Sequence, residues 1–443
     1  MAAADNRRDV MRQSAIVLAF GWLLAPLQFL TAVIVARAVG PDGKGALALL
    51  TGLTAILVSL GGLGIPSGAA ALYRRDDYPE PHVIATALAV TLMSSMVLAL
   101  ATLAGGAPLL STVLPQRELA NIPPAWILLA LAAVPPAALA AVIDVLLIAA
   151  NAMRLYALRS AVSGLAGIAI TWLLTVILGW GVAGALVSYP VAAIVGFAFF
   201  AYWWIRQIDR PPLQFSVACA RALLHVGVQQ QALAIIALVA KRFDVFLIAS
   251  MLTLQDAGFY AAAILIPQAI VSIPRSTMWP LVSAMSSEGG EVSEVVARIS
   301  RLQVLLMVVI AAALYALAPI IILGLFGSAF SPSIAPFRWA LLGVPFTPLT
   351  ITVNAILTAR RRPGLSIAAA FAGTSTQLIV MILLLERWGA SAAAAALSVN
   401  FIVTAVLQLV VARRQGVPVT QMVVAKREDV GLLVKRVRGY VRR

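Results

Sequence analysis

The chain is poor in cysteine, histidine and charge, and each shortage removes a class of protein. One cysteine, Cys219, in 443 residues cannot form an internal disulfide. Two histidines, His82 and His225, are too few and too scattered for a metal site. Charged residues make up 11% of the chain and apolar residues 62%. No globular surface could be made polar enough from this composition, so an ordinary soluble domain is excluded.

What the chain does have is long apolar runs. They reach about 20 residues, the length a helix needs to cross ~30 Å of hydrocarbon, and the mean hydropathy is +0.99. Strict two-residue alternation is absent, which favours helices over barrel strands. The first run, residues 14–36, is too long for a signal peptide and lacks a small-residue cleavage site, so it is interpreted as a retained span. The sequence therefore predicts an all-α integral membrane protein.

The runs predict about twelve transmembrane helices in two halves. Their expected bounds are residues 14–36, 46–72, 83–104, 123–150, 157–178, 182–205, 222–252, 258–285, 302–326, 334–358, 365–385 and 389–412. Midway, Pro211 and Pro212 interrupt the apolar pattern with a pair that a helix interior does not accommodate. The expected domains are a cytoplasmic N-terminus at 1–13, an N-lobe of six spans at 14–205, a cytoplasmic linker at 206–221, a C-lobe of six spans at 222–412 and a basic cytoplasmic tail at 413–443.

Basic residues outnumber acidic ones by 32 to 17, and they concentrate in alternate loops. One set of segments carries Arg7, Arg8, Arg12, Arg74, Arg75, Arg154, Arg159, Arg206, Arg210, Arg221, Arg298, Arg301, Arg360, Arg361, Arg362 and the tail from Arg413. The other loops hold Arg37, Lys44, Arg117, Arg338 and Arg387. Because cytoplasmic loops collect Lys and Arg, both termini are expected in the cytoplasm. The net charge of +15 then reports topology, and nucleic acid is not expected as a partner. The basic tail either lies on anionic membrane lipid or is a disordered end.

Two stretches of the chain occur twice. The sequence IVARAVGPDGKGA at 34–46 matches LIASMLTLQDAGFY at 247–260, with a shift of 258 − 45 = 213 residues. A second pair, LGWGVAGA at 178–185 and ERWGASAA at 386–393, agrees with a shift of 389 − 181 = 208 residues. An even number of spans in each half makes the halves parallel repeats, so two six-helix lobes around a central cavity are expected, as in many transporters.

Three stretches resemble the polysaccharide (lipid-linked oligosaccharide) flippases of the multidrug/oligosaccharidyl-lipid/polysaccharide exporter superfamily. They are the ARxxGPDxxG turn at 36–45, FDxFLI at 243–248 followed by AGFY at 257–260, and GWGVAGA at 179–185. The resemblance covers most of residues 10–412. It implies movement of a polyprenyl-diphosphate-linked glycan from the cytoplasmic to the outer leaflet of a cell inner or plasma membrane by alternating access. Enzymes of polysaccharide assembly are then a candidate class of protein partner.

Charged residues inside the expected spans are the candidates for substrate binding, because each costs about 2.5 to 3.5 kcal/mol at a span centre. The seventh span carries Lys241, Arg242 and Asp244, and the eighth carries Arg275 near Pro274. Guanidinium groups form paired hydrogen bonds with phosphate oxygens, so these cations are expected to bind a diphosphate headgroup. For Lys241 and Asp244, an intrahelical ion pair at i, i+3 is the open alternative.

Further candidates are polar residues of other spans. Asp144 in the fourth span and Asp244 are rival ion-coupling carboxylates, because a desolvated acid can carry a proton. Gln28 and Asn354 could contact the headgroup or sugar, and helix-to-helix hydrogen bonding is their alternative. Arg37 ends the first span, where it either binds substrate or anchors the helix at the interface.

Two prolines, Pro66 and Pro274, occupy similar places in the two halves and are expected to act as hinges.

Two other functions remain open. A cation-coupled multidrug antiporter of the same superfamily would be expected to carry buried acids, whereas this chain has an excess of basic residues in its spans. A membrane glycosyltransferase or ligase would be expected to place acids on an outer loop, whereas the Asp76-Asp77 pair falls in a loop expected inside. No nucleophile-base constellation, phosphate loop or metal spacing is apparent, so neither catalysis nor a cofactor is expected.

Overall fold

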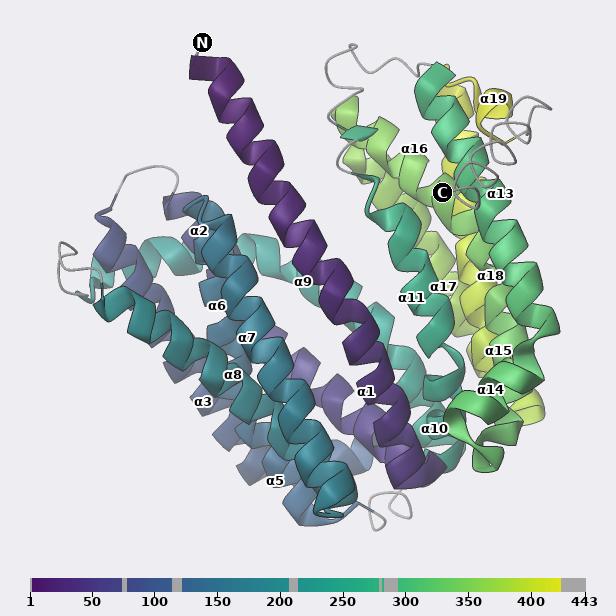
Figure 1. Ribbon diagram of the computed structural model, residues 1–443, viewed down its shortest axis with the longest axis horizontal. Coiled ribbons are helices and arrows are strands. Elements are labelled where there is room, and N and C mark those ends of the chain that lie inside the picture. The colour runs from purple at the N-terminus through teal and green to yellow at the C-terminus, as the bar shows by residue number, and fades with distance from the viewer. Residues whose placement is uncertain are drawn as a thin grey trace, which may run out of the picture. The chain divides into compact units, whose positions relative to one another are not determined.

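The structure is a computed structural model that describes the backbone of residues 2–73, 78–113, 122–206, 214–278, 281–282 and 294–423. Side chains are described over the same ranges except 2–24, 106–113, 229–230, 232–241 and 423. Every regular element in these ranges is a helix (Figure 1). The chain forms two compact units, Met1–Gly258 and Phe259–Arg443, which are described in turn.

The described residues of the first unit form nine helical elements and the start of a tenth. They are α1 (Ala2–Gly61), α2 (Ile65–Tyr73), α3 (Glu80–Val113), α5 (Pro124–Ala132), α6 (Val134–Ala149), α7 (Met153–Trp172), the π-helical turn η1 (Leu173–Ile177), α8 (Gly181–Ile205), α9 (Val217–Met251) and the start of α10 (Leu254–Ala263). Helix α9 packs against α1, α2 and α3. This compact unit is therefore larger than the lobe expected at 14–205, whose bounds stay a prediction about the internal repeat.

The second unit holds the remaining helices. They are the rest of α10, α11 (Leu265–Arg275), α13 (Glu294–Ala316), α14 (Ala318–Phe326), η2 (Ser328–Ser333), α15 (Ile334–Leu341), η3 (Val344–Phe346), α16 (Thr347–Ala359), α17 (Pro363–Trp388), α18 (Ala390–Arg414) and α19 (Val419–Val423). Amide hydrogen bonds join α17 to α18, since Asn400 Nδ2 donates to Gln377 Oε1 at 2.7 Å and Gln408 Nε2 donates to Ser366 Oγ at 2.7 Å. Interhelical bonds of this kind suit a surrounding of hydrocarbon.

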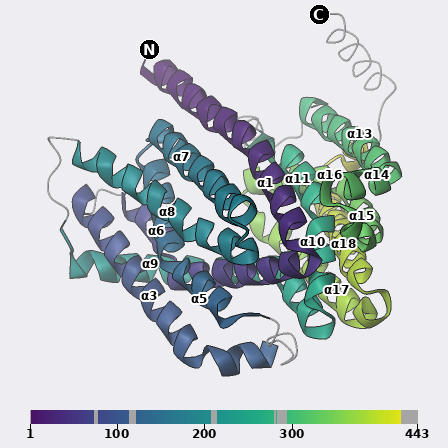
Figure 2. The ribbon, with the colours of Figure 1, turned by 60° about the horizontal axis from the view of Figure 1, so that its bottom comes forward.

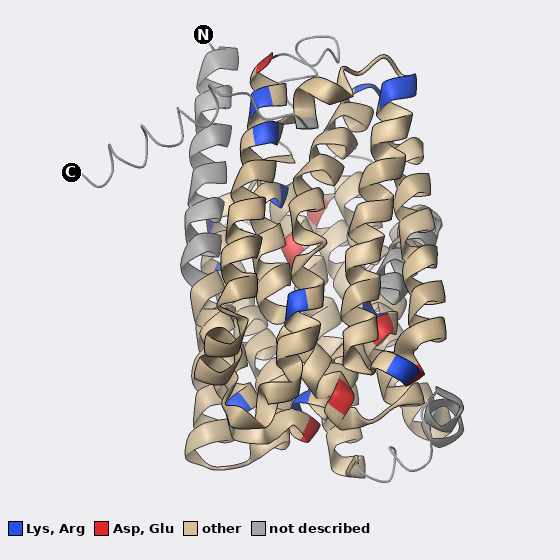
Figure 3. Cartoon of the chain, turned by 90° about the vertical axis from the view of Figure 1, so that its right-hand side faces the viewer, with Lys and Arg blue, Asp and Glu red and all other residues tan. Residues whose placement is uncertain are grey.

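Ten helices of the described chain are long and apolar enough to span a membrane. Two of the twelve spans expected from the sequence are not counted separately. The span 46–72 is counted together with 14–36, because both lie within α1 and its continuation. The span 222–252 lies in α9, of which only Val217–Val228 is counted as apolar helix. The helices that face the viewer in Figure 3 carry few basic or acidic residues along their length. The all-α membrane fold expected from the sequence is confirmed.

Breaks in the helices fall where the sequence places glycine and proline. The α1 element bends at Gly40, whose φ is 69° and ψ −178°. It ends at Gly61, and α2 begins four residues later, with Pro66 in its first turn, where a missing N–H costs little. Pro274 lies one residue before the end of α11. Each proline therefore sits near a helix end, and its role as a hinge stays a prediction.

The glycine that follows tryptophan has a similar φ in both copies of the second repeated stretch. Gly181 is the first residue of α8 with φ 54°, and Gly389 precedes α18 with φ 56°. Both values lie in the left-handed region, which residues with a Cβ rarely adopt. The shared conformation explains why both copies place glycine directly after tryptophan.

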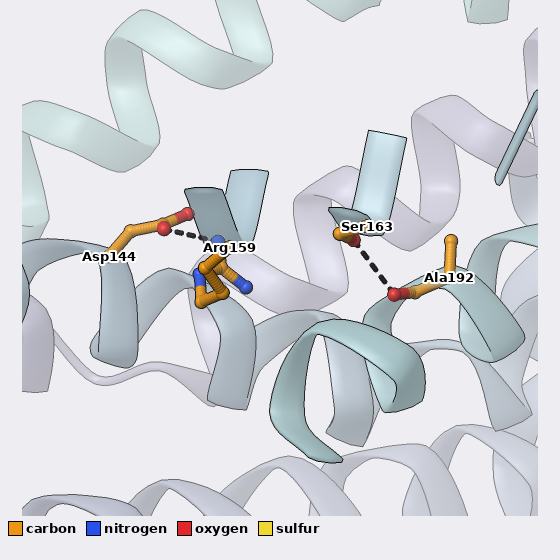
Figure 4. A network of polar contacts seen from close by, with 4 residues as sticks. All are labelled: Asp144, Arg159, Ser163 and Ala192. Atoms are coloured by element: carbon orange, nitrogen blue, oxygen red, sulfur yellow. Dashed lines mark hydrogen bonds and ion pairs between the residues drawn. The ribbon is translucent and has the colours of Figure 1, made fainter. Parts of the chain in front are cut away.

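Small residues bring α7 and α8 close together, and the two helices lie side by side in Figure 1 and Figure 2. A Cβ on Gly196 would lie 3.1 Å from Ser163 Cβ, and a Cβ on Gly167 would lie 3.1 Å from Ala192 Cβ. The Ser163 hydroxyl donates to the Ala192 carbonyl oxygen at 2.7 Å (Figure 4). Each helix thus carries a small-xxx-small pair, the pattern that lets membrane helices pack backbone to backbone.

The two copies of the first repeated stretch contact each other through their glycines. A Cβ on Gly45 would overlap the carbonyl oxygen of Leu254, and a Cβ on Gly258 would overlap that of Pro41. Each of these Cβ positions also lies 3.0 Å from the backbone nitrogen of the other glycine. Since 41 + 213 = 254 and 45 + 213 = 258, the two contacts are equivalent under the sequence repeat. The contact therefore has local two-fold symmetry.

Side chains around this contact add hydrogen bonds. Gln255 Nε2 donates to Asp42 Oδ2 at 3.4 Å, and these two positions are again related by 213 residues. Thr253 Oγ1 accepts from the backbone N–H of Asp256 at 3.1 Å and donates to the Asp256 carboxylate at 2.7 Å. This arrangement resembles a capping box, which satisfies free donors at the start of α10. Asp256, the acidic residue of the second repeated turn, thus stabilises the start of α10.

We expect Gly45→Val to destabilise the chain. The added side chain must displace the Leu254 carbonyl, and overpacking of this kind costs about 1–3 kcal/mol. The measurement is the apparent melting temperature of the purified protein in detergent. Gly105→Ala is the control, because a Cβ there has no atom within 4 Å. Equal melting temperatures for Gly45→Val and Gly105→Ala would show that the glycine contact is not tight.

Candidate functional site

Arg242 places a positive charge on an exposed face of α9. Its Cδ lies 3.9 Å from the position that a Cβ on Gly52 of α1 would take, so the arginine stem runs alongside α1. Arg242 has no acidic partner among the described residues. An exposed guanidinium can bind an anion such as phosphate.

Asp244 lies two residues further along α9 and is buried. Its side chain is 6% exposed, and its Oδ1 accepts the backbone N–H of Val245 at 2.8 Å. The side chain of Lys241 lies outside the described residues, so both interpretations of Lys241 and Asp244 stay open. The position of Asp244 is compatible with ion coupling, which no contact tests.

Arg275 ends α11 in the second unit and is exposed. The neighbouring Ser272 and Ser276 donate to backbone carbonyls of their own helix at 2.5 and 2.7 Å, so these hydroxyls are already engaged. Among the described residues, Arg275 has no acidic partner. It therefore offers a second guanidinium without an acidic partner in the described chain, on the other compact unit, and its role in substrate binding stays a prediction.

The remaining polar candidates lie on separate helices. Gln28 is exposed on the first part of α1, and Arg37 is exposed three residues before the bend at Gly40. Asn354 is half-buried in α16 of the second unit. The roles of these three residues stay predictions.

Asp144 has a partner that the sequence analysis missed. Arg159 Nη2 of α7 donates to Asp144 Oδ1 of α6, and the two form an ion pair (Figure 4). The Arg159 side chain is 4% exposed and that of Asp144 31%. Arg159 was interpreted as a cytoplasmic loop residue, which is wrong because it lies inside the packed helices, at the Gly196 side of α8. Asp144 is therefore not the isolated desolvated acid that the coupling hypothesis assumed.

The ion pair also leaves hydrogen-bonding capacity unused. Arg159 Nε and Nη1 are buried without a partner. Such donors are costly unless water or another acceptor reaches them. The sequence carried a signal for the pair: α6 ends five residues after Asp144, and α7 begins six residues before Arg159. Two opposite charges at nearly equal distances from a short turn face each other in an antiparallel helix hairpin.

We expect the loss of one partner of the Asp144–Arg159 ion pair to lower stability more than the loss of both. Asp144→Asn leaves a buried guanidinium uncompensated, a loss of about 3–5 kcal/mol, whereas Asp144→Asn with Arg159→Met removes the charge as well and recovers much of the stability. The measurement is the apparent melting temperature of the single and double variants. Arg154→Met, an exposed arginine of the same helix, should change little. A double variant no more stable than Asp144→Asn would contradict a compensating pair.

Comparison with known proteins shows which family the chain belongs to. The family model described as "Polysaccharide biosynthesis protein" matches residues 34–335, more than half of the chain. A search of curated proteins gives no match. Among solved structures, the lipid II flippase MurJ in an inward closed conformation is similar at a TM-score of 0.74 and 14% identity, covering 92% of this chain and 89% of that one.

Two multidrug transporters are also similar in fold. An inward-facing multidrug resistance MATE family transporter of the MOP superfamily aligns at a TM-score of 0.69 and 15% identity, covering 90% of this chain and 97% of that one. The eukaryotic MATE transporter AtDTX14 aligns at 0.60 and 14%, covering 92% and 96%. At such identities the likeness concerns the fold alone. Together with the family match, it identifies the chain as a multi-pass membrane protein of the polysaccharide biosynthesis family, with the transporter and flippase fold of the MOP superfamily.

Proposed function

We propose that the chain moves a polyprenyl-diphosphate-linked oligosaccharide from the cytoplasmic to the outer leaflet of the cell membrane by alternating access. The carrying observation is Arg242, an exposed guanidinium on an apolar helix with no acidic partner among the described residues. A fixed cation in hydrocarbon is stabilised when an anion binds it. A diphosphate supplies that anion and accepts the paired hydrogen bonds of a guanidinium.

Three further observations support this substrate class. Arg275 is a second exposed cation without an acidic partner in the described chain. The matching family is named for polysaccharide biosynthesis. MurJ, whose printed name is a lipid II flippase, shares the fold. In this proposal Lys241, Gln28, Arg37 and Asn354 contribute to headgroup and sugar contacts, and both termini face the cytoplasm.

The proposal predicts loss of flipping when the cations are removed. We expect Arg242→Ala and Arg275→Ala each to lower the initial rate by about tenfold or more, because a charge-assisted hydrogen bond contributes roughly 1.5–3 kcal/mol. Arg242→Lys should retain part of the rate, since an ammonium keeps the charge but not the paired geometry. The measurement is made in proteoliposomes that contain a fluorescent polyprenyl-diphosphate oligosaccharide in both leaflets. The rate at which this lipid becomes accessible to an external modifying enzyme reports flipping.

Controls separate this outcome from damage to the fold. Arg154→Ala removes an exposed arginine of α7 that the proposal does not use, and it should flip at the wild-type rate. Wild-type flipping in Arg242→Ala and Arg275→Ala would refute the cationic headgroup site. Wild-type protein that moves no lipid-linked sugar would refute the function.

A cation-coupled multidrug antiporter is the second candidate, because MATE transporters share the fold. Its coupling acid would be Asp244, which is buried, or Asp144, whose carboxylate forms an ion pair with Arg159. Export of a cationic dye driven by an ion gradient, without movement of lipid-linked sugar, would favour this candidate.

The prolines near helix ends provide a separate prediction. We propose that Pro66 and Pro274 help α2 and α11 to bend during alternation. The double change Pro66→Ala, Pro274→Ala should then slow turnover while leaving substrate affinity near wild type, because proline removes a helical hydrogen bond and permits bending. Turnover and half-saturation in the same proteoliposomes measure both quantities. Unchanged turnover in the double variant would remove the hinge role.

A further inference from the structure

A cleft of about 350 Å³ lies on the second unit, away from Arg275. It is lined by the end of α13, by η2 and by α15, through Tyr315, Ser331, Pro332, Ile334, Ala335, Arg338, Trp339 and Leu342. The helices around it belong to one compact unit, so the cleft is complete within that unit. Neither the sequence candidates nor the proposed transport path uses it.

Arg338 is the charged group of this cleft. Its Nε donates to the Tyr315 carbonyl oxygen at 3.3 Å, and its guanidinium carbon lies 5.2 Å from the centre of the Tyr315 ring. These contacts hold the stem and Nε in place. Arg338 has no acidic partner among the described residues, so its charge is uncompensated there. The fixed guanidinium suits a phosphate oxygen.

The aromatic rings of the cleft argue against a sugar as the occupant. Trp339 stacks on Trp388 with ring centres 5.8 Å apart, and the Arg338 guanidinium covers a face of Tyr315. Each ring therefore has one face already occupied, so a pyranose could not stack on that face. Tryptophan and tyrosine in such pairs are instead typical of the membrane interface, where lipid headgroups lie.

Apolar side chains continue from the cleft along the surface. Leu342 lines it and is exposed, and α14, which begins three residues after Tyr315, exposes Leu317 and Ile320, the latter at 70%. A solvent-facing surface would seldom expose large apolar residues so fully, whereas a lipid-facing one does. An apolar surface beside a fixed cation matches the two parts of a phospholipid.

We propose that this cleft binds an anionic phospholipid. The phosphodiester accepts hydrogen bonds from the Arg338 guanidinium and the Ser331 hydroxyl, and the acyl chains lie over Leu342 and the exposed face of α14. A zwitterionic lipid is disfavoured because its own ammonium competes for the phosphate, whereas an anionic lipid leaves a net charge to neutralise Arg338. In the orientation proposed for transport, the lipid belongs to the outer leaflet.

The test is native mass spectrometry of the full-length chain with phosphatidylglycerol or phosphatidylcholine of identical acyl chains. We expect wild type to bind the first phosphatidylglycerol more tightly than phosphatidylcholine. Arg338→Ala should weaken that first phosphatidylglycerol about tenfold, equivalent to about 1.4 kcal/mol, and leave phosphatidylcholine unchanged. Arg387→Ala is the matched control: it removes an exposed arginine beside Trp388 that does not line the cleft.

A second variant locates the effect. Ala335→Trp keeps Arg338 but fills the cleft, so it should also weaken phosphatidylglycerol. Equal binding of the two lipids, or wild-type phosphatidylglycerol binding in both Arg338→Ala and Ala335→Trp, would overturn the proposal and leave adventitious association. Displacement of phosphatidylglycerol from wild type, but not from Arg338→Ala, by equimolar polyprenyl diphosphate would also overturn it, since the cleft would then serve a diphosphate lipid.

Discussion

A tight backbone contact between the two copies of the repeated turn fixes how α10 starts against α1 in the first unit. Gly45 and Gly258 leave room for the carbonyls of Leu254 and Pro41, so α10 begins directly against the second part of α1. Any side chain at either glycine would separate these helix starts. The local two-fold relation means that one backbone geometry, duplicated, satisfies both sides of the contact. Two copies of one repeated sequence can therefore pack against each other with the same residues on both sides of the contact.

Four arginines of the described chain differ in burial and in ion pairing. Arg159 and Arg301 are buried, and each has an ion-pair partner, Asp144 and Glu294, the latter at 2.8 Å. Arg242 and Arg275 are exposed and have no acidic partner among the described residues. Burying an unpaired charge costs several kcal/mol, so compensation marks the structural arginines. Those without it are the residues from which a ligand can gain binding energy.

Small residues set how the helices of the first unit pack. The Ser163, Gly167, Ala192 and Gly196 positions bring α7 against α8, and Gly64 and Gly68 bring α2 against α9. Lipid tails are as apolar as leucine, so helix association relies on close packing and hydrogen bonds more than on the hydrophobic effect. The same close packing carries Arg159 into the interior, because Gly196 leaves space beside its guanidinium.

Composition and periodicity alone determined that the chain is an all-α membrane protein with an internal repeat, because span length and apolar content depend on hydrocarbon thickness and not on tertiary detail. They also indicated Arg242 and Arg275 as basic residues within expected apolar spans, since both lie inside long apolar runs. Only tertiary structure decided which charges meet between helices. Asp144 and Arg159 are 15 residues apart, and their pairing depends on how α6 turns into α7. The sequence showed both glycines of the repeated turn, but their contact arises from folding across 213 residues, a distance over which local chemistry specifies no geometry.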